Sequence, residues 1–494
     1  MSVTSVAPRS GPFIDGAWVQ GDGEVIEVEN PATGAVIGSV SAASLDQVDA
    51  AVQAAARAFQ SWRRTSVLER VETCRRAFDI CTERNDEIIH MISREVGKTL
   101  RQSRSEMVRG TAEHFRRAAE DVLRHAGKVL PSTMDHTTAK KVLVVDQPVG
   151  VVAAVSPWNF PVDIAGIPII YGLALGCTVV WKPSEYAPLC AQLFAEVLRD
   201  AGFPSGSFNV VHGRGDVGRA LVRHPDVGAV VFTGSVETGE EVARDAGLKN
   251  RVLELGGNGP QIVLADADLD RAADAAVRGC FFLAGQCCTA AERLLVHETV
   301  KDRFLDALVE RTRRLRVGDP LSDDTDMGPL CTAGVLARTQ AHIKDAESKG
   351  ARIVCGGGHH GQFHEPTILD GVTSDMLIAQ EETFGPVAPI MTFRDLDEAI
   401  SIANETQYGL TASVFTQSLQ DAWYVAEELE HGTVHVNEST NYWDQLAPFG
   451  GMKKSGAGRE LSSWIIDALT ETKQITFDVT RAEESGRAQG PRMV

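Results

Sequence analysis

The stretch that decides the fold runs from Val151 to Glu185 and reads VVAAVSPWNFPVDIAGIPIIYGLALGCTVVWKPSE. Its first five residues are typical of a buried strand. The uncharged run IPIIYGLALG suits a buried helix that ends at glycine, and CTVVW returns to a buried strand. A strand, a helix and a second strand in immediate succession predict a parallel pair with a helix packed across it.

The same alternation continues on both sides of Pro260. Before it, the strand-like runs FNVVHG, AVVFTG and RVLELGG are separated by helical runs such as PLCAQLFAEVLRDAG. After it, PQIVLADA, ERLLVHE and TVHVN stand among helices such as VKDRFLDALVERTRRLRVG. Short β-branched runs between helices indicate parallel sheets covered on both faces. The sequence therefore predicts an α/β fold with two parallel-sheet domains. No linker-like composition separates them, so we expect close packing around a cleft.

Other segments frame these two series. FIDGAWV is a hairpin signal around Asp15-Gly16, and the region from Leu45 to about Gly127 has helical periodicity. The run AKKVLVVDQPVGVVAAV then returns to strands. The tail RAEESGRAQGPRMV is polar, and we expect it to be loose.

Composition excludes several classes of protein. The chain has 494 residues, of which 43% are hydrophobic and 23% charged, as in a globular protein of more than one domain. Its formal charge of −19 argues against a nucleic-acid partner. The start MSVTSVAPRSGPF has no apolar signal core, so we expect a cytoplasmic protein. The uncharged segment from Ile164 to Trp181 divides into a helix and a strand, so we expect no membrane span.

The nine cysteines include two neighbours, Cys287 and Cys288, in FFLAGQCCTAAERLL. The chain has no C-x-x-C and no zinc-type spacing, so we expect reduced thiols and no metal site. Gly285 lets the backbone approach a ligand closely, and a thiolate in a polar or positive niche is a nucleophile. A cysteine among alanine and leucine is more often a packing residue. The stretch alone leaves both interpretations open.

Polar residues follow the predicted strands of the first series. They are Asn159, Lys182, Glu185, Ser235 and Glu254. Ligands bind beyond the carboxyl ends of parallel strands, so we expect these side chains to converge at one edge. FTGSVETG offers amides for a phosphate, or is simply a glycine cap followed by a helix start. WKPSE is either a surface turn or a grip on two ribose hydroxyls.

Five motifs together carry a resemblance. They are SPWNFP, LELGGNGP, FFLAGQCC, EETFGPV and PFGGMKKSGAGRE, and from about Phe13 to Asp478 they resemble the aldehyde dehydrogenase superfamily in order and spacing. The resemblance implies two Rossmann-like parallel-sheet domains plus a small β oligomerisation element. The sequence departs from the family at Leu283, where Asn is frequent, and at Asn258-Gly259, where Lys-x is frequent. Both departures concern loop packing.

The resemblance also divides the chain. It implies a dinucleotide-binding domain over residues 1–127 and 148–256 and a catalytic domain over 257–453. Residues 128–147 and 470–482 become oligomerisation strands, and 483–494 a flexible tail. An exposed strand edge invites pairing with another subunit, so we expect a homodimer or a dimer of dimers.

By the same resemblance, Cys288 is the nucleophile, Glu254 the general base and Asn159 the oxyanion-hole amide. The implied reaction is an NAD-dependent oxidation of a small-molecule aldehyde to the acid, through a thiohemiacetal and a thioester on Cys288. Relatives that pass the acyl group to coenzyme A tend to lack the glutamate, so hydrolysis is favoured. The alternatives are a coenzyme A-acylating semialdehyde dehydrogenase and a catalytically silent structural or binding protein on the same fold.

The cofactor and substrate residues follow from the same motifs. A carboxylate at Glu185 would bond a ribose 2′-hydroxyl and repel a 2′-phosphate, so NAD is expected and NADP is the less favoured alternative. Relatives acting on small anionic aldehydes often place Arg where Cys287 stands, which disfavours semialdehyde acids as substrates. The implied cofactor-binding residues are Pro157, Trp158, Lys182, Ser184, Glu185, Gly215, Phe232, Gly234, Ser235, Leu255, Glu382 and Phe384. The implied pocket residues are Met107, Thr111, Phe160, Ile164, Ile167, Cys287, Thr289, Tyr442, Trp443 and Phe449.

Overall fold

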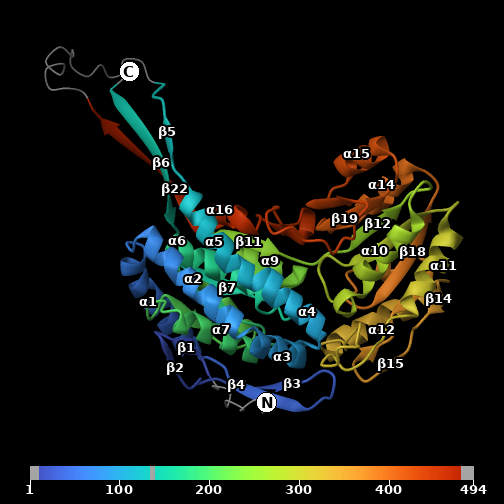
Figure 1. Cartoon of the computed structure of the whole chain (residues 1–494), viewed down its shortest axis with the longest axis horizontal. Coiled ribbons are helices and arrows are strands. Elements are labelled where there is room, and N and C mark those ends of the chain that lie inside the picture. The colour runs from blue at the N-terminus through green and yellow to red at the C-terminus, as the bar shows by residue number, and fades with distance from the viewer. Residues whose placement is uncertain (1–10, 134–138, 480–494) are drawn as a thin grey trace.

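The fold is known from a computed structural model, which describes residues 11–133 and 139–479. Two parallel sheets lie side by side, and a three-stranded ribbon extends away from the first (Figure 1). The predicted α/β fold with two parallel sheets and a small β element is confirmed. The predicted tail 483–494 and the last three residues of the predicted strand 470–482 lie outside the described residues.

The first sheet has the strand order β2-β1-β9-β8-β7-β10-β11-β21. Its five central strands, from β9 to β11, are parallel, while β1 and β21 join the ends in antiparallel fashion. Chain order reverses between β7 and β10. The strands are β1 (Phe13–Ile14), β2 (Ala17–Trp18), β7 (Val151–Val155), β8 (Thr178–Lys182), β9 (Phe208–Val210), β10 (Val227–Thr233), β11 (Asn250–Glu254) and β21 (Gly456–Ala457).

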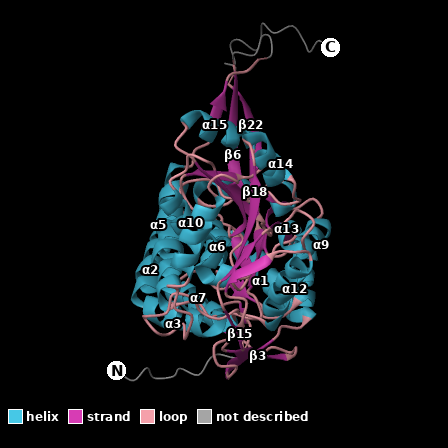
Figure 2. Ribbon diagram, turned by 90° about the vertical axis from the view of Figure 1, so that its right-hand side faces the viewer, coloured by secondary structure: helices cyan, strands magenta, loops and turns pink. Residues whose placement is uncertain are grey.

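Helices cover both faces of this sheet, as Figure 2 shows for the molecule as a whole. One face packs against α1 (Leu45–Trp62), α8 (Gly215–Arg223) and α9 (Val236–Ala246). The other packs against α2 (Val67–Glu83), α3 (Asn85–Val96), α5 (Ala112–Arg124), α6 (Asp163–Leu175) and α7 (Pro188–Asp200). Burial of both faces explains why the strands read as continuous apolar runs.

The helix α6 is apolar on every side and ends at Gly176, whose φ of 97° is left-handed. Of its residues, all but Asp163 and Ile164 are buried. It passes directly into β8, which is buried throughout. The uncharged segment is therefore core, as the sequence predicts. In residues 11–133 and 139–479 no helix has the length and apolarity to cross a bilayer.

The second sheet has the order β14-β17-β18-β13-β12-β19-β20, parallel except for β14. Its strands are β12 (Gly259–Val263), β13 (Ala291–His297), β14 (Arg352–Cys355), β17 (Thr367–Asp370), β18 (Val387–Phe393), β19 (Thr411–Phe415) and β20 (Thr433–Val436). One face packs on α10 (Leu269–Phe281) and α11 (Lys301–Thr312). The other packs on α12 (Ala333–Ser348), α13 (Leu377–Gln380), α14 (Leu396–Asn404) and α15 (Leu419–Glu428).

The projecting ribbon consists of β5 (Lys128–Leu130), β6 (Lys140–Pro148) and β22 (Thr470–Asp478). Strand β22 pairs antiparallel with β6 along its whole length, from Thr470 opposite Pro148 to Asp478 opposite Lys140. Two further hairpins lie elsewhere, β3 (Val25–Glu29) with β4 (Val36–Ser41) and β15 (His359–His360) with β16 (Phe363–His364). Short helical segments η3 (Lys453–Ser455), η4 (Ser462–Ile465) and α16 (Ile466–Leu469) return the chain to the first sheet.

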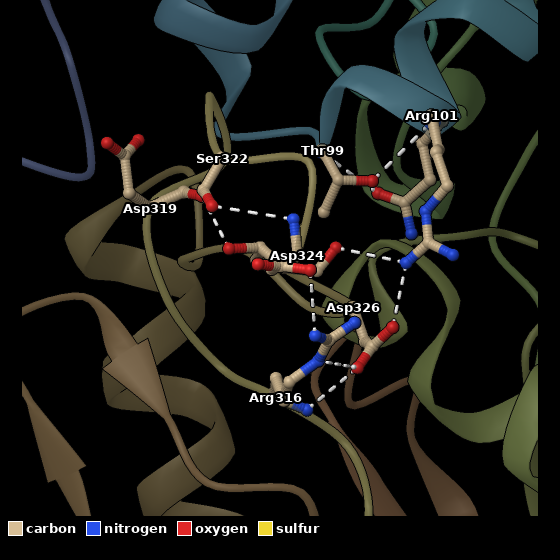
Figure 3. A network of polar contacts seen from close by, with 9 residues as sticks. Thr99, Arg101, Arg316, Asp319, Ser322, Asp324 and Asp326 are labelled. Carbon is tan, nitrogen blue, oxygen red and sulfur yellow. Dashed lines mark hydrogen bonds and ion pairs between the residues drawn. The ribbon is translucent and has the colours of Figure 1, made fainter.

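A polar network joins the helical region of the first half to the second half (Figure 3). Arg101, on α4 (Leu100–Ser105), donates to the Asp326 carboxylate at 2.7 Å and to the Thr325 carbonyl at 3.1 Å. Arg316 donates to the same carboxylate at 3.1 Å. The Leu100 amide donates to the Pro320 carbonyl at 3.0 Å. These bonds fix α4, and the residues just before it, against the second half of the molecule.

Candidate active site

A cleft lies at the carboxyl ends of β7 and β10, where the strand order of the first sheet reverses. Reversal points of this kind are where open parallel sheets bind ligands. Nine predicted site residues line it, namely Pro157, Trp158, Asn159, Gly234, Ser235, Leu255, Cys288, Glu382 and Phe384. Thr233, Gly256, Val335 and Arg338 line it as well, and the sequence did not single them out. Residues from both halves of the chain therefore meet in one cleft.

The remaining predicted cofactor residues lie outside this lining. Lys182 is the last residue of β8 and is buried. Its ammonium group donates to the Glu185 carboxylate at 3.2 Å. Ser184 is buried between them, and Gly215 begins α8. Phe232 is buried on β10.

The loop that carries Cys288 is forced into a sharp turn. After α10, the segment η2 (Phe282–Gly285) contains Leu283 and Ala284, whose φ values of 52° and 53° are both left-handed. At Gly285 a Cβ would lie 2.1 Å from the Gly385 carbonyl oxygen, so only glycine permits this approach. The departure at Leu283 falls on a backbone conformation that Asn tolerates and that costs leucine about 1–2 kcal/mol.

Hydrogen bonds hold the loop in place. The Asn159 side-chain amide donates to the Gln286 carbonyl at 3.1 Å, across the boundary between the two sheets. Gln286 is fully buried, and its own side chain donates to the Leu283 carbonyl and accepts from the Cys331 amide. Asn159 and the thiol loop are therefore fixed relative to each other.

The two neighbouring thiols occupy different environments. Cys287 is buried, and its sulfur lies 3.2 Å from the Thr289 hydroxyl. Cys288 is half-buried and lines the cleft. Its pKa is raised well above the usual range by a hydrogen bond with Cys287, by burial, and by the nearby carboxyl groups of Glu382 and Glu254. These surroundings therefore disfavour the thiolate form of Cys288.

Glu254 ends β11 and is only 2% exposed. Neither of its oxygens has a hydrogen-bond partner among the described residues. Burial, followed by the charge of Glu460, raises the pKa of Glu254 well above its usual range, and Arg459 offsets this in part. A buried carboxyl without partners destabilises a fold, so its presence beside a cleft points to chemistry.

The loop after α13 is positioned by residues that the sequence analysis missed. Glu292, inside β13, accepts from the amides of Thr383 at 2.6 Å and Phe384 at 2.7 Å. Arg338 donates to the Thr383 carbonyl at 3.1 Å. Glu382 accepts from the Gly257 amide at 2.8 Å, and burial raises its pKa to about 7. Two adjacent charged residues in a buried strand, Glu292 and Arg293 in AERLLVH, were the available signal for Glu292.

The predicted pocket residues fall into two groups. Met107, Thr111, Ile167, Cys287 and Thr289 are buried. Phe160, Ile164, Trp443 and Phe449 are half-buried, and Tyr442 is exposed with its ring edge-on to His435. Thr289 donates to the Asn441 side chain at 2.6 Å, which fixes its orientation.

Phe282, which the sequence analysis did not select, contacts two residues of the second group. Its ring stacks on Phe160 with 6.4 Å between centroids and packs against Trp443 at 5.7 Å.

Comparisons with known proteins agree with this geometry. The profile of the Aldehyde dehydrogenase family matches residues 18–475. The mitochondrial succinate-semialdehyde dehydrogenase of Arabidopsis thaliana is 40% identical over 94% of this chain and 89% of its own. The NADP(+) succinate-semialdehyde dehydrogenase of Escherichia coli is 40% identical over 94% of this chain and 97% of its own.

A solved structure shows the same fold. Betaine aldehyde dehydrogenase from Staphylococcus aureus, in complex with NAD+, superposes with a TM-score of 0.92 at 34% identity, over 98% of this chain and 96% of its own. The family profile spans both sheets and the cleft between them. The chain belongs to the aldehyde dehydrogenase family.

Proposed function

We propose that this chain oxidises an aldehyde to the carboxylic acid with NAD, using Cys288 as nucleophile, Asn159 as oxyanion donor and Glu254 as general base. The observation that supports the proposal is that Cys288 and Asn159 line one cleft together with Leu255, which directly follows Glu254. The Glu254 carboxyl is also among the groups that raise the pKa of the Cys288 thiol. Both relatives described above are named as aldehyde-oxidising enzymes, one of them NADP-dependent.

The cleft residues fit a dinucleotide. Ser235 caps α9 by accepting from the Thr238 amide, and a helix start of this kind favours a phosphate. A Cβ at Gly239 would lie 2.3 Å from Leu255, so the helix start packs closely on the strand end. Lys182 and Glu185 offer a donor and an acceptor for ribose hydroxyls. When bound, the nicotinamide cofactor supplies a two-electron acceptor.

The chain's own residues perform the remaining steps. As the Cys288 sulfur bonds to the carbonyl carbon, its proton passes to solvent water in the cleft and the carbonyl oxygen becomes anionic. Asn159 keeps one amide hydrogen free of Gln286 to donate to that oxygen, a contact worth about 3 kcal/mol in comparable sites. Loss of hydride from this carbon leaves a thioester on Cys288.

Glu254 then completes the cycle. It takes a proton from water as the water oxygen bonds to the thioester carbon, and it delivers that proton to the sulfur as the carbon–sulfur bond breaks, which restores the thiol. Glu254 must be ionised for this step. Because Glu254 activates water, this assignment also favours hydrolysis of the thioester over transfer of the acyl group to coenzyme A.

Finer features belong to the same proposal. We assign the first sheet and its helices to cofactor binding and the second to catalysis, with the division given above. Glu185 favours NAD over NADP. The ribbon exposes Val129, Leu130 and Phe477, which supports its role in a homodimer or a dimer of dimers. We place the enzyme in the cytoplasm.

One assay tests the proposed function. NADH formation is measured with a panel of aldehydes, with and without coenzyme A, for the wild type and Cys288→Ala. We expect coenzyme A-independent turnover in the wild type and none in the variant. Turnover that requires coenzyme A would support the acylating alternative. No turnover with any aldehyde would support the silent alternative.

A further inference from the structure

We propose that the side chains beside Cys288 select uncharged aromatic aldehydes over aldehydes that carry a carboxylate or a quaternary ammonium group. The inference rests on the proposed function, because it concerns the substrate of the same thiol. It goes against the substrate named for the two relatives above, since succinate semialdehyde carries a carboxylate.

Three half-buried rings form an aromatic cluster, defined here as Phe160, Phe282 and Trp443. The centroid distances are 6.4 Å between the two phenylalanines, 5.8 Å from Phe160 to Trp443 and 5.7 Å from Phe282 to Trp443. These are the distances of attractive aromatic pairs. Because each residue keeps part of its surface exposed, the cluster offers aromatic surface to a further ring.

Chain connectivity places the cluster beside the reacting groups. Phe160 directly follows Asn159, and Phe282 opens the segment η2 that leads into the thiol loop. The lining of the cofactor cleft contains Asn159 and Cys288 but none of the three rings. A substrate body held on the cluster would therefore reach the thiol from outside the cofactor cleft.

The cation in contact with the cluster already has a partner. The Lys98 ammonium lies 3.5 Å from the centroid of the Phe160 ring and forms an ion pair with Glu106. Both side chains are fully buried. Glu106 also accepts from the amides of Val162 and Asp163, each at 3.2 Å. Lys98 is therefore committed to Glu106 and is not free to pair with a substrate carboxylate.

The charge of Lys98 also acts on the Cys287 thiol. Burial opposes ionisation of Cys287, but hydrogen bonds from Cys288 and Thr289, together with the charge of Lys98, lower the pKa of Cys287. The Lys98 ammonium occupies one face of the Phe160 ring, so a quaternary ammonium group cannot stack on that face. The same lysine thus disfavours quaternary ammonium aldehydes, although aromatic clusters elsewhere bind such groups.

The surroundings keep Lys98 in position. Gly97 packs against Gly328, where a Cβ would lie 2.0 Å from the Gly97 carbonyl oxygen. Leu100 and Arg101 are anchored to the second half by the polar network of Figure 3. These contacts hold the main chain on both sides of Lys98, and the ion pair with Glu106 holds its ammonium group.

A second cation near the cluster is paired as well. Arg278, on the helix that runs into Phe282, lies 3.7 Å from the carboxylate of Glu438. Glu438 belongs to the same loop as Trp443. A carboxylated aldehyde at the cluster would have to lose water, and both of the cations described here already face an acidic partner.

The first test is a kinetic comparison that needs no variant. NADH formation by the wild-type enzyme is measured with benzaldehyde, hexanal, succinate semialdehyde and betaine aldehyde at one pH and ionic strength. We expect kcat/KM for benzaldehyde to exceed that of either charged aldehyde by at least about a hundredfold, in the range that mismatched polar groups produce in enzyme pockets. Succinate semialdehyde or betaine aldehyde matching benzaldehyde would overturn the inference.

Two variants localise the effect. Trp443→Ala should raise KM for benzaldehyde by about tenfold or more, with a smaller change for hexanal. Trp443→Arg, which adds a cation without a partner, should raise the ratio of kcat/KM for succinate semialdehyde to that for benzaldehyde. Trp423→Ala, at an exposed tryptophan of α15, is the matched control. It should change neither the KM for benzaldehyde relative to that for hexanal nor the ratio of kcat/KM for succinate semialdehyde to that for benzaldehyde. Unchanged ratios in both Trp443 variants would contradict the assignment of the cluster.

The outcome also separates the two proposals. If succinate semialdehyde is the best substrate and Cys288→Ala is inactive, the specificity inference fails and the proposed function stands. If no aldehyde yields NADH, the proposed function itself fails.

Discussion

The side-chain amide of Asn159 donates to the main-chain carbonyl of Gln286 at 3.1 Å, and this bond ties the turn after β7 to the thiol loop. Gln286 stands two residues before Cys288. One hydrogen of the amide thus fixes the loop, and the proposed mechanism assigns the other to the substrate oxygen. In that mechanism, the bond lets a residue from the first half of the chain and one from the second act on the same carbonyl group.

Removing this amide should slow the reaction strongly. For Asn159→Ala we expect kcat to fall by about 10²–10³-fold, because a donor aimed at the developing oxyanion is lost. Steady-state kinetics with a preferred aldehyde provide the measurement, and thermal unfolding controls for the loss of the bond to Gln286. A kcat within about threefold of wild type would remove Asn159 from the oxyanion site.

The proposed general-base role of Glu254 predicts a pH dependence. Because its pKa is raised by burial and by Glu460, the carboxyl is neutral at lower pH and becomes an active base only as the pH rises. Thioester hydrolysis should therefore accelerate with increasing pH. In Glu254→Gln this dependence should disappear, and an initial burst of NADH should be followed by a steady rate lower by about 10²-fold or more. Stopped-flow absorbance at several pH values measures both phases. A variant with the wild-type steady rate would exclude Glu254 as the base.

Cofactor preference should depend on Glu185. Wild-type kcat/KM should favour NAD over NADP by at least about tenfold, since the carboxylate repels a 2′-phosphate. Glu185→Gln should raise relative use of NADP by about tenfold, equivalent to about 1.4 kcal/mol. Glu310→Gln, at an exposed acid of α11, is the charge-matched control. A wild type that prefers NADP would contradict this account of the ribose site.

Close packing of the thiol loop can be tested at Gly285. Its φ is +75°, and a Cβ there would meet the Gly385 carbonyl at 2.1 Å. Gly371 has a similar φ of +79°, with nothing within 4 Å of an added Cβ. Gly371→Ala should cost about 1–2 kcal/mol of unfolding free energy from backbone strain alone. Gly285→Ala should cost clearly more and also lower kcat. Equal changes in denaturant unfolding, with full activity in both, would refute the close approach of the two loops.

The sequence predicts most of the fold, because the chain marks it locally. The β-branched runs around Val151 and Pro260 give both sheets, and the uncharged run ending at Gly176 gives α6 and β8. The order of strands within each sheet, and with it the reversal between β7 and β10, is set by long-range pairing that no local pattern records.

The candidate site divides in a similar way. Residues in motifs, such as Cys288 and Glu382, could be selected because the motifs carry a family resemblance. Lys98, Glu292 and Phe282 could not, because their roles depend on partners distant in sequence. Lys98 pairs with Glu106 beneath a ring contributed by another segment, and Glu292 holds a loop about ninety residues away. A pair of charged residues, Glu292 and Arg293, inside a buried strand was the signal for Glu292, but the amides it holds could be known only from the folded chain.

The most direct measurement identifies the residue that carries the acyl group. Glu254→Gln, in which the thioester should persist, is mixed with benzaldehyde and NAD, quenched in acid, digested and analysed by mass spectrometry. The account predicts one benzoyl group on Cys288 and none on Cys287, formed in proportion to the burst of NADH. A burst with the benzoyl group on Cys287, or with no acylated peptide at all, would contradict it.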